Sequence, residues 1–352
     1  MKRCSIDVIY GGEILAEPVM TERYQILLAE GTVLQKEYIE KIRELGITEI
    51  CIWEPGEREA KQKIIAARIE TQNKLKTQVK SVLERHIYQE NKELQKLSDT
   101  AESIIEDILE EDNIVDNMIE IKNRSADIYE HCINCCALSA ILGLRLGFGQ
   151  DVLHAIGTGC LLHDIGLRFI SVQYENKAEE EMPENQRIEY RKHTIYGYSS
   201  LDKETWLNEI SKKIILSHHE RMDGSGYPFK SRDISDEISL VSICDAFDEM
   251  ICGIGCRQMK IYEAIEYLKN FKNIKFNGRI VDEFLKIMAF YPVGSQVILN
   301  TGEIGVVIGQ NKGFPERPVL RITKRKDGSN IIRTFVRNLL DEKYVFIEKV
   351  VN

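Results

Sequence analysis

The sequence predicts a mainly α-helical protein with a small β-rich domain at each end. Residues 57–122 are highly charged and contain no proline, and their apolar residues recur at helical spacing. The same spacing continues through most of residues 123–290, whereas residues 291–352 alternate between short apolar runs and turn signals. These changes in composition divide the 352 residues into four parts, 1–56, 57–122, 123–290 and 291–352.

The first part predicts a β-rich domain with one helix. We expect strands at 6–10, 24–28 and 50–53, and a helix over 36–45 that ends at Gly46. No residues in this domain have catalytic spacing, so we expect the chemistry elsewhere.

The second part predicts one long helix followed by further helix. Its apolar stripe runs from Ile65 to Leu83 and continues from Leu94 to Ile108. The stripe suits a homodimer seam along residues 57–90, although its heptads are imperfect. Packing of an amphipathic helix on its own domain explains the stripe equally well. His86 has no partner motif, and we expect it at the surface.

The third part is expected to be all helical and the fourth a small β-barrel-like domain. Helices are predicted at 127–146, 150–162, 209–219, 238–252 and 262–269, with Gln150 and Asp151 capping the second of them. An exposed acidic loop is predicted at 175–184, and strands at 296–299, 304–308 and 319–322.

Composition excludes several classes of protein. The net charge of −9 argues against a nucleic-acid partner. No apolar run is long enough for a transmembrane helix, and the first residues lack the apolar core of a signal peptide, so we expect a cytoplasmic protein.

The nine cysteines are expected to be reduced. Cys132, Cys135 and Cys136 cluster, but no second pair follows at a spacing usual for zinc.

The strongest functional signal is the stretch 217–228, which reads Ser-His-His-Glu-Arg-Met-Asp-Gly-Ser-Gly-Tyr-Pro. Its adjacent histidines, His218 and His219, can ligate a metal ion. The glycine-rich turn that follows can bring backbone amides close to an anion. Upstream, His163-Asp164-Ile165-Gly166 supplies a second histidine–acid pair.

Together, HDIG and HHERxDGxGYP resemble the HD-GYP family of metal-dependent phosphodiesterases, which cleave cyclic di-GMP. The resemblance covers about residues 125–290 and implies an HD-type helical bundle. It also implies two divalent metal ions. The ligands of the first ion match His131, His163, Asp164 and Asp245, and those of the second match Asp164, His193, His218 and His219.

Asp127 is a further candidate metal ligand. It precedes His131 by four residues, so on one helix both side chains would face the same side. It stands where the family sometimes has a glutamate that serves a third ion. Mixed imidazole and carboxylate ligands suit iron, manganese or zinc, and we expect iron or manganese.

Two ions about 3.5–4 Å apart would activate a bridging water and stabilise charge on the phosphate oxygens. Asp164 and Arg168 are the candidate catalytic residues. The candidate substrate-binding residues are Arg221, Asp223, Gly224, Gly226, Tyr227 and Arg257. A purely structural alternative stays open for the turn, in which Asp223 bonds its own backbone and Tyr227 packs on the turn.

Three positions depart from the family pattern. Leu167 replaces the lysine that directly follows HDIG, and Ile254 replaces the first of two basic residues after Asp245, Arg257 standing at the second. Asn277 replaces an aspartate. The metal ligands are therefore complete, while the contacts to substrate phosphate are fewer, which implies a slow enzyme.

The expected function is hydrolysis of the phosphodiester bond of cyclic di-GMP, or a related cyclic dinucleotide, in bacterial second-messenger signalling. The first alternative is a non-catalytic, metal-containing HD-GYP module that binds a nucleotide or protein partner, which Leu167 and Ile254 favour. The second is an HD phosphohydrolase for another nucleotide, which the Gly-Tyr-Pro block disfavours.

Overall fold

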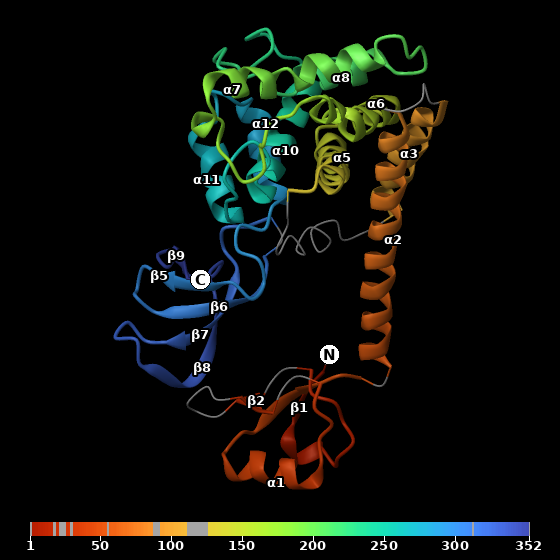
Figure 1. Ribbon diagram of the computed structural model, residues 1–352. Coiled ribbons are helices and arrows are strands. Elements are labelled where there is room, and N and C mark those ends of the chain that lie inside the picture. The colour runs from red at the N-terminus through yellow and green to blue at the C-terminus, as the bar shows by residue number, and fades with distance from the viewer. Residues whose placement is uncertain are drawn as a thin grey trace. The chain divides into compact units, whose positions relative to one another are not determined.

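The computed structural model describes residues 2–16, 19–20, 26–28, 31–54, 56–86, 92–110, 126–311 and 313–351. The chain divides into two compact units (Figure 1). One unit comprises Met1–Gln72, Val293–Asn311 and Arg317–Asn352, and the other comprises Asn73–Pro292 with Lys312–Glu316. The four-part division drawn from composition stays a prediction.

The N-terminal segment is β-rich with one helix, as predicted. Its elements are β1 (Lys2–Ser5), β2 (Val19–Met20), β3 (Ile26–Leu28), α1 (Lys36–Glu44) and β4 (Glu49–Ile52). Strand β1 pairs antiparallel with β4, and β2 pairs antiparallel with β3. Helix α1 buries Ile39 and Ile42 in a small core. The predicted strand at 6–10 is wrong, because Ile6–Val8 forms a single 3-10 turn capped by the Ser5 hydroxyl. Residues 24 and 25 of another predicted strand lie outside the described residues.

The long helix α2 (Glu57–His86) is followed by η2 (Lys92–Gln95) and α3 (Lys96–Glu110). Val79 and Leu83 of α2 are buried in the same cluster as Leu97 of α3. The second half of the apolar stripe therefore packs within its own unit. The homodimer predicted through residues 57–90 stays a prediction. Residues 87–90 and the side chain of His86 lie outside the described part of the chain.

The prediction of an all-helical third part is confirmed. Its elements are α5 (Ile128–Arg145), α6 (Gln150–Leu162), η4 (Ile165–Phe169), η5 (Glu179–Glu181), α7 (Glu184–Arg191), α8 (His193–Leu201), α9 (Glu209–Ser217), α10 (Asp236–Cys252), α11 (Ile261–Asn270) and α12 (Gly278–Ile287). Helices α5 and α6 lie side by side, with α3 and α9 against α6 and α10 against α5 (Figure 1). The N-cap of α6 is Gly149, so the expected capping by Gln150 and Asp151 is wrong.

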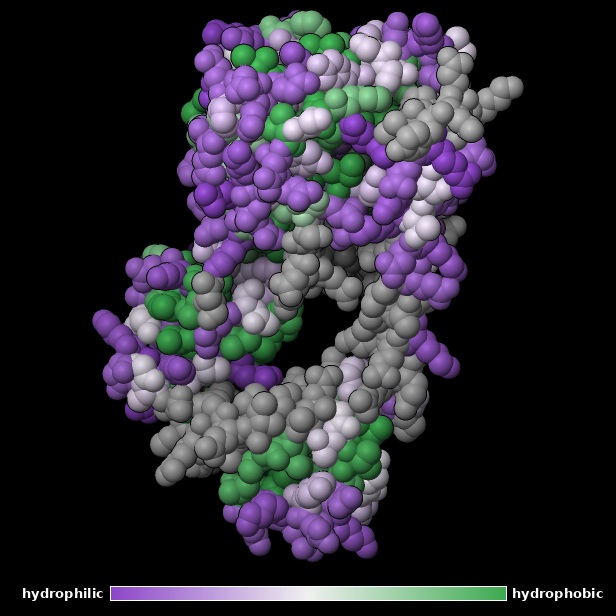
Figure 2. Space-filling model, in the orientation of Figure 1, coloured by the Kyte–Doolittle hydropathy of each residue, from purple (hydrophilic) through white to green (hydrophobic). Residues whose placement is uncertain are grey.

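One large apolar cluster forms most of the core of this helical unit. Its largest fully buried side chains include Phe247 of α10 and Phe284 of α12, whose rings meet edge to face. The outer face drawn in Figure 2 is mostly hydrophilic over α7 and α11. Burial of the apolar face of each helix is the main driving force for this packing. Among the helices described, none is long and apolar enough to cross a membrane.

The C-terminal segment folds as an antiparallel sheet with the order β8-β7-β6-β5-β9. Its strands are β5 (Gln296–Leu299), β6 (Ile304–Gly309), β7 (Val319–Lys324), β8 (Asn330–Asn338) and β9 (Ile347–Val351). Alternate residues such as Val297, Leu299, Leu320 and Ile322 are fully buried, which is the period of two expected of a sheet with one covered face. The three predicted strands are present, and β8 and β9 were not predicted.

Candidate metal centre

Histidine and aspartate side chains from separate helical elements meet in the interior of the helical unit. All seven are at most 6% exposed. They are His131 on α5, His163 and Asp164 after α6, His193 at the start of α8, His218 and His219 after α9, and Asp245 on α10. Their ligand atoms fall into two groups, His131 with His163 and Asp245, and Asp164 with His193, His218 and His219.

Asp164 lies between two sets of imidazoles. Its Oδ2 atom lies 3.6 Å from His131 Nε2 and 3.5 Å from His163 Nε2. Its Oδ1 atom lies 3.5 Å from His193 Nε2 and 3.8 Å from His218 Nε2. Each oxygen of one carboxylate thus faces a different set, which is the arrangement needed to bridge two cations.

Backbone carbonyl groups orient the histidine rings. The Nδ1 atom of His163 lies 2.6 Å from the Cys160 carbonyl oxygen, and that of His193 lies 2.7 Å from the Tyr190 carbonyl oxygen. The Nδ1 atom of His218 also faces carbonyl groups of α9. Because a carbonyl oxygen only accepts, each Nδ1 carries the proton and each Nε2 presents a lone pair.

Nε2 atoms of the histidines also face one another at short range. His131 Nε2 lies 3.2 Å from His163 Nε2, and His193 Nε2 lies 3.4 Å from His218 Nε2. In addition, the Oδ2 atoms of Asp164 and Asp245 are buried and accept no hydrogen bond within the described residues. Buried acceptors without donors are costly unless a cation satisfies them. Imidazole nitrogens with carboxylate oxygens fit divalent iron, manganese or zinc, so the residues fit a metal centre.

The environment controls the protonation of the histidines. Burial, helped by the neighbouring His163, lowers the pKa of His218 to about 3. Burial also lowers the pKa of His219 well below its usual value, with a smaller contribution from His218. For His131, burial acts in the same direction, but hydrogen bonds with Asp245 and Asp248 raise its pKa well above the usual value. His218 and His219 are therefore held neutral, the form that binds metal.

The glycine-rich turn is anchored directly beside the histidines. The buried Glu220 carboxylate accepts hydrogen bonds from the Phe229 N–H at 2.7 Å and the Ser231 N–H at 2.8 Å. A Cβ atom at Gly226 would lie 2.3 Å from the His219 carbonyl oxygen, so only glycine permits this approach. The absence of a side chain at Gly226 therefore allows the turn to lie against His219, a candidate metal ligand.

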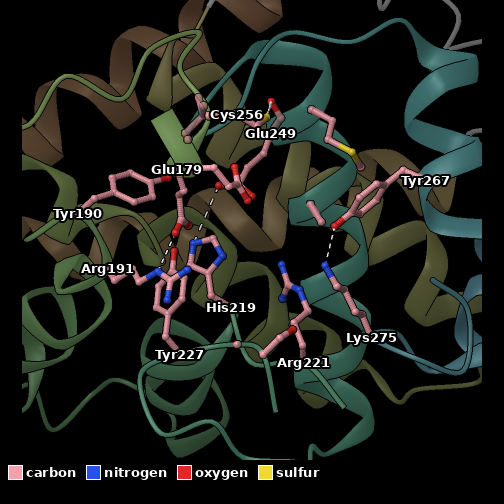
Figure 3. Close-up of a pocket in the computed structure, with 18 of the residues that line it drawn as sticks. Glu179, Tyr190, Arg191, His219, Arg221, Tyr227, Glu249, Cys256, Tyr267 and Lys275 are labelled. Carbon is pink, nitrogen blue, oxygen red and sulfur yellow. Dashed lines mark hydrogen bonds and ion pairs between the residues drawn. The ribbon is translucent and has the colours of Figure 1, made fainter. Parts of the chain in front are cut away.

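A cavity of about 400 Å³ opens beside His219. Arg221 and Lys275 lie together on one side of it and Glu179 and Arg191 on the other (Figure 3). His219 and Glu249 lie between these two sides (Figure 3). Part of the acidic loop predicted as merely exposed, Glu179 included, thus forms cavity wall.

Four of the predicted substrate-binding residues line the cavity: Arg221, Gly226, Tyr227 and Arg257. Arg221 is held by the Ser242 hydroxyl at 2.5 Å and by the His218 carbonyl oxygen at 3.0 Å. Arg257 is exposed and pairs with Glu181 at 2.8 Å.

Asp223 and Gly224 are not among the residues that line the cavity. The Asp223 carboxylate accepts from the Ser225 N–H and hydroxyl, as the structural alternative expected. Gly224 has a φ of 77°, so it serves the turn geometry.

Two further candidates lie away from the cluster. Asp127 does not share a helix face with His131, because it is the N-cap of α5 and precedes the helix. Its carboxylate pairs with Lys76 at 2.6 Å, so the expected role with a third ion is not supported by its position. Arg168 donates to the Tyr129 hydroxyl at 2.9 Å and does not line the cavity.

The positions that depart from the family pattern have structural roles. Leu167 is 4% exposed and packs with Met182 and Tyr190. Ile254 is 1% exposed at the cavity wall. Asn277 is the N-cap of α12, and its side chain accepts hydrogen bonds from the backbone N–H groups of Arg279 and Ile280. Aspartate can serve as an N-cap in the same way.

Glu249 and Lys275 are among the cavity residues that the sequence did not predict. Glu249 follows Asp245 by four residues on α10, and that spacing was a usable signal. Lys275 precedes Phe276 and carries no such signal, because its place in the cavity wall depends on tertiary packing.

Parts of this chain are similar to known proteins. Residues 128–250 match the model of the HD domain, and residues 296–352 match that of the KOW domain associated with HD domain. A cyclic di-GMP phosphodiesterase of Pseudomonas aeruginosa is 28% identical over 219 residues, which are 61% of this chain and 52% of that protein. A cyclic di-GMP phosphodiesterase of Thermotoga maritima is 29% identical over 203 residues, 56% of this chain and 55% of that protein.

The chain thus spans about half the length of these curated relatives. The solved structure of an HDG"Y"P protein from Bdellovibrio bacteriovorus has a TM-score of 0.54 at 19% identity. It covers 80% of this chain and 97% of its own, and it shows that the folds are alike. The part of the helical unit that matches the HD domain thus contains the cluster of potential metal-ligating side chains. Among HD domains, the resemblance to the HD-GYP phosphodiesterases is confirmed.

Proposed function

We propose that this protein is a metal-dependent phosphodiesterase that hydrolyses cyclic di-GMP or a related cyclic dinucleotide in bacterial second-messenger signalling. One observation carries the proposal. A buried cluster, in which Asp164 faces two sets of imidazoles, adjoins a cavity whose wall contains the cations Arg221 and Lys275. The names of the relatives support the same substrate class.

The proposed reaction is attack of water on a phosphodiester. Two divalent ions, once bound, would supply an activated water and neutralise charge on the phosphate. Asp164 and the Nε2 atoms of His163 and His193 would hold them, because their lone pairs converge. Iron or manganese is the proposed metal. The protein's own part is to hold these donors in a buried site.

The cavity wall supplies groups that suit an anionic dinucleotide. The Arg221 guanidinium is fixed by Ser242 and lies 5.1 Å from the centre of the Phe276 ring. Lys275 donates to the uncharged Tyr267 hydroxyl at 3.1 Å, and it forms no ion pair with a carboxylate of the described chain. We propose that both bind substrate phosphate, because a charge-assisted hydrogen bond in a cavity is strong.

A second candidate is a non-catalytic metal-containing module that binds a cyclic dinucleotide. Leu167 and Ile254 favour it, because both are buried apolar side chains and supply no phosphate contact. For either function we propose action in the cytoplasm, which free thiols such as those of Cys135, Cys136 and Cys244 favour.

Turnover of a nucleotide panel tests these proposals. Protein loaded with iron or manganese is incubated with cyclic di-GMP, 3'3'-cGAMP, cyclic di-AMP and a nucleoside triphosphate, beside a His193→Ala variant. Cleavage of a cyclic dinucleotide by the wild type alone supports the phosphodiesterase. Tight binding without cleavage supports the binding module, and cleavage of the triphosphate alone contradicts both.

A further inference from the structure

Glu249 brings a second carboxylate to the metal centre. It lies one helical turn after Asp245 on α10, so both side chains project from the same face. Its side chain is 13% exposed and lines the cavity, and its Oε1 atom lies 3.9 Å from His219 Nε2 (Figure 3). One ligand atom from each of His219, Asp245 and Glu249 lies within 4.8 Å of the other two. These three residues form a potential ligand set of their own.

Asp245 has one carboxylate oxygen that the first ligand group does not use. Its Oδ1 atom lies 3.1 Å from His131 Nε2 and 3.2 Å from His163 Nε2, so this oxygen belongs to the first ligand group. Its Oδ2 atom lies 3.8 Å from His219 Nδ1 and accepts no hydrogen bond from any described residue. Asp245 is 1% exposed, so water does not readily satisfy this oxygen.

We propose that His219, Asp245 and Glu249 hold an additional divalent cation at the cavity wall. Two carboxylates brought together in a buried site repel each other, and a cation between them removes that cost. One imidazole nitrogen with carboxylate oxygens suits manganese or iron. The inference rests on the proposed metal centre, since Asp245 and His219 also belong to it. It places the additional ion at Glu249, whereas Asp127 pairs with Lys76.

The position of this ion has a consequence for the substrate. Three protein ligands leave coordination positions open, and Glu249 lines the cavity. A phosphate oxygen of a cyclic dinucleotide can take such a position. The cation thereby supplies positive charge at a site where Leu167 and Ile254 supply none.

Manganese stoichiometry tests the proposal without reference to activity. Wild type, Glu249→Gln and Glu237→Gln are loaded with manganese, freed of excess ion, and analysed for metal per chain. Glu237 lies on the same helix, in its first turn, and outside the cluster, so its variant controls for loss of one negative charge. We expect Glu249→Gln to lose about one equivalent and Glu237→Gln none, because only the former removes a ligand.

Two results would overturn the proposal in different ways. If wild type and Glu249→Gln hold the same number of ions with the same affinity, Glu249 is no ligand, and the metal centre itself stands. If the wild type binds no manganese or iron at all, the metal centre falls together with this inference. Anomalous diffraction from manganese-loaded wild-type crystals gives a check that needs no variant. A peak beside the Glu249 carboxylate supports the site, and peaks confined to the other histidines reject it.

Discussion

Tyr227 lies stacked on His219, with ring centroids 4.6 Å apart and planes inclined by 28°. The Tyr227 ring is 7% exposed, and its hydroxyl is buried with no hydrogen-bond partner among the described residues. The tyrosine of the Gly-Tyr-Pro block thus contacts a candidate metal ligand directly. Its position suggests that it restrains the His219 ring.

Replacing Tyr227 should therefore weaken metal binding through His219. An aromatic pair contributes about 0.5–1.5 kcal/mol beyond buried area, so Tyr227→Leu should weaken manganese affinity by up to about tenfold. Tyr227→Phe keeps the stacked ring and should bind as the wild type does. Calorimetric titration of metal-free protein measures both affinities. Equal weakening by the two variants would assign the effect to the hydroxyl instead.

Loss of the Asp164 carboxylate should reduce the amount of bound metal per chain more than loss of the His218 imidazole. Asp164 faces both ligand groups, whereas His218 belongs to one. Asp164→Ala should lower metal content below that of His218→Ala, measured by elemental analysis. His154→Ala is the control, because His154 lies on α6 but bonds Ser98 outside the cluster. If the control loses metal equally, the losses reflect misfolding.

The contribution of His218 to the stability of metal-free protein should fall as the pH falls from 6 to 5. The folded-state pKa of His218 is lowered to about 3, so the unfolded chain takes up the proton first. The folded-state pKa of His131 is raised, so its contribution to the free energy of unfolding is already complete below its unfolded pKa of about 6.5. That contribution therefore stays nearly constant between pH 6 and pH 5. The His218 contribution falls by up to about 1.4 kcal/mol per pH unit. Urea unfolding of wild type and His218→Gln should give a shallower dependence for the variant. A steeper dependence in the variant would contradict the assignment.

Lys275 should matter for substrate binding. Its ammonium group lines the cavity and donates only to a neutral hydroxyl among its described partners. Lys275→Ala should raise the KM for cyclic di-GMP by at least roughly tenfold, because one charge-assisted contact is worth about 1.5–3 kcal/mol. Lys272→Ala is the matched control, since Lys272 pairs with Asp282 and is not a cavity residue. Steady-state kinetics of both variants checks this, and an equal change in the two would reject a specific role.

Leu167→Lys should raise turnover of cyclic di-GMP and lower thermal stability. Leu167 packs against Tyr190, which lines the cavity, so the longer lysine side chain can reach the cavity edge. A new charge-assisted donor there is worth about 2–4 kcal/mol, which corresponds to a rate increase of roughly thirtyfold to several hundredfold. The lost apolar packing lowers the melting temperature. Leu167→Met preserves the packing and should change neither quantity, and metal content should stay constant in both. An unchanged rate in the lysine variant would show that other cations, such as Arg221, already serve the phosphate.

Local sequence determined the helices and the chemical nature of the site. Helical periodicity predicted 127–146 where the helix is Ile128–Arg145, because the apolar spacing of a helix is a local property. The adjacent pairs His163-Asp164 and His218-His219 identified the candidate ligands. Metal binding explains these residues in their short motifs better than structural packing does. The spacing of Asp127 and His131 was misleading, since a separation of four does not distinguish an interior position from an N-cap.

Tertiary structure alone decided how these residues meet. His131 and Asp245 are 114 positions apart, yet their side chains lie 3.1 Å from each other because α5 packs on α10. Which oxygen of Asp164 or Asp245 faces which imidazole depends on that packing, and so does the access of Glu249 and Lys275 to the cavity. Buried side chains meet through the apolar faces of helices distant in sequence, and no local pattern specifies the relative rotation of those faces. Sequence therefore identified the candidate ligands, and the fold determined how they are grouped, which carboxylate oxygen faces each group and which residues form the cavity wall.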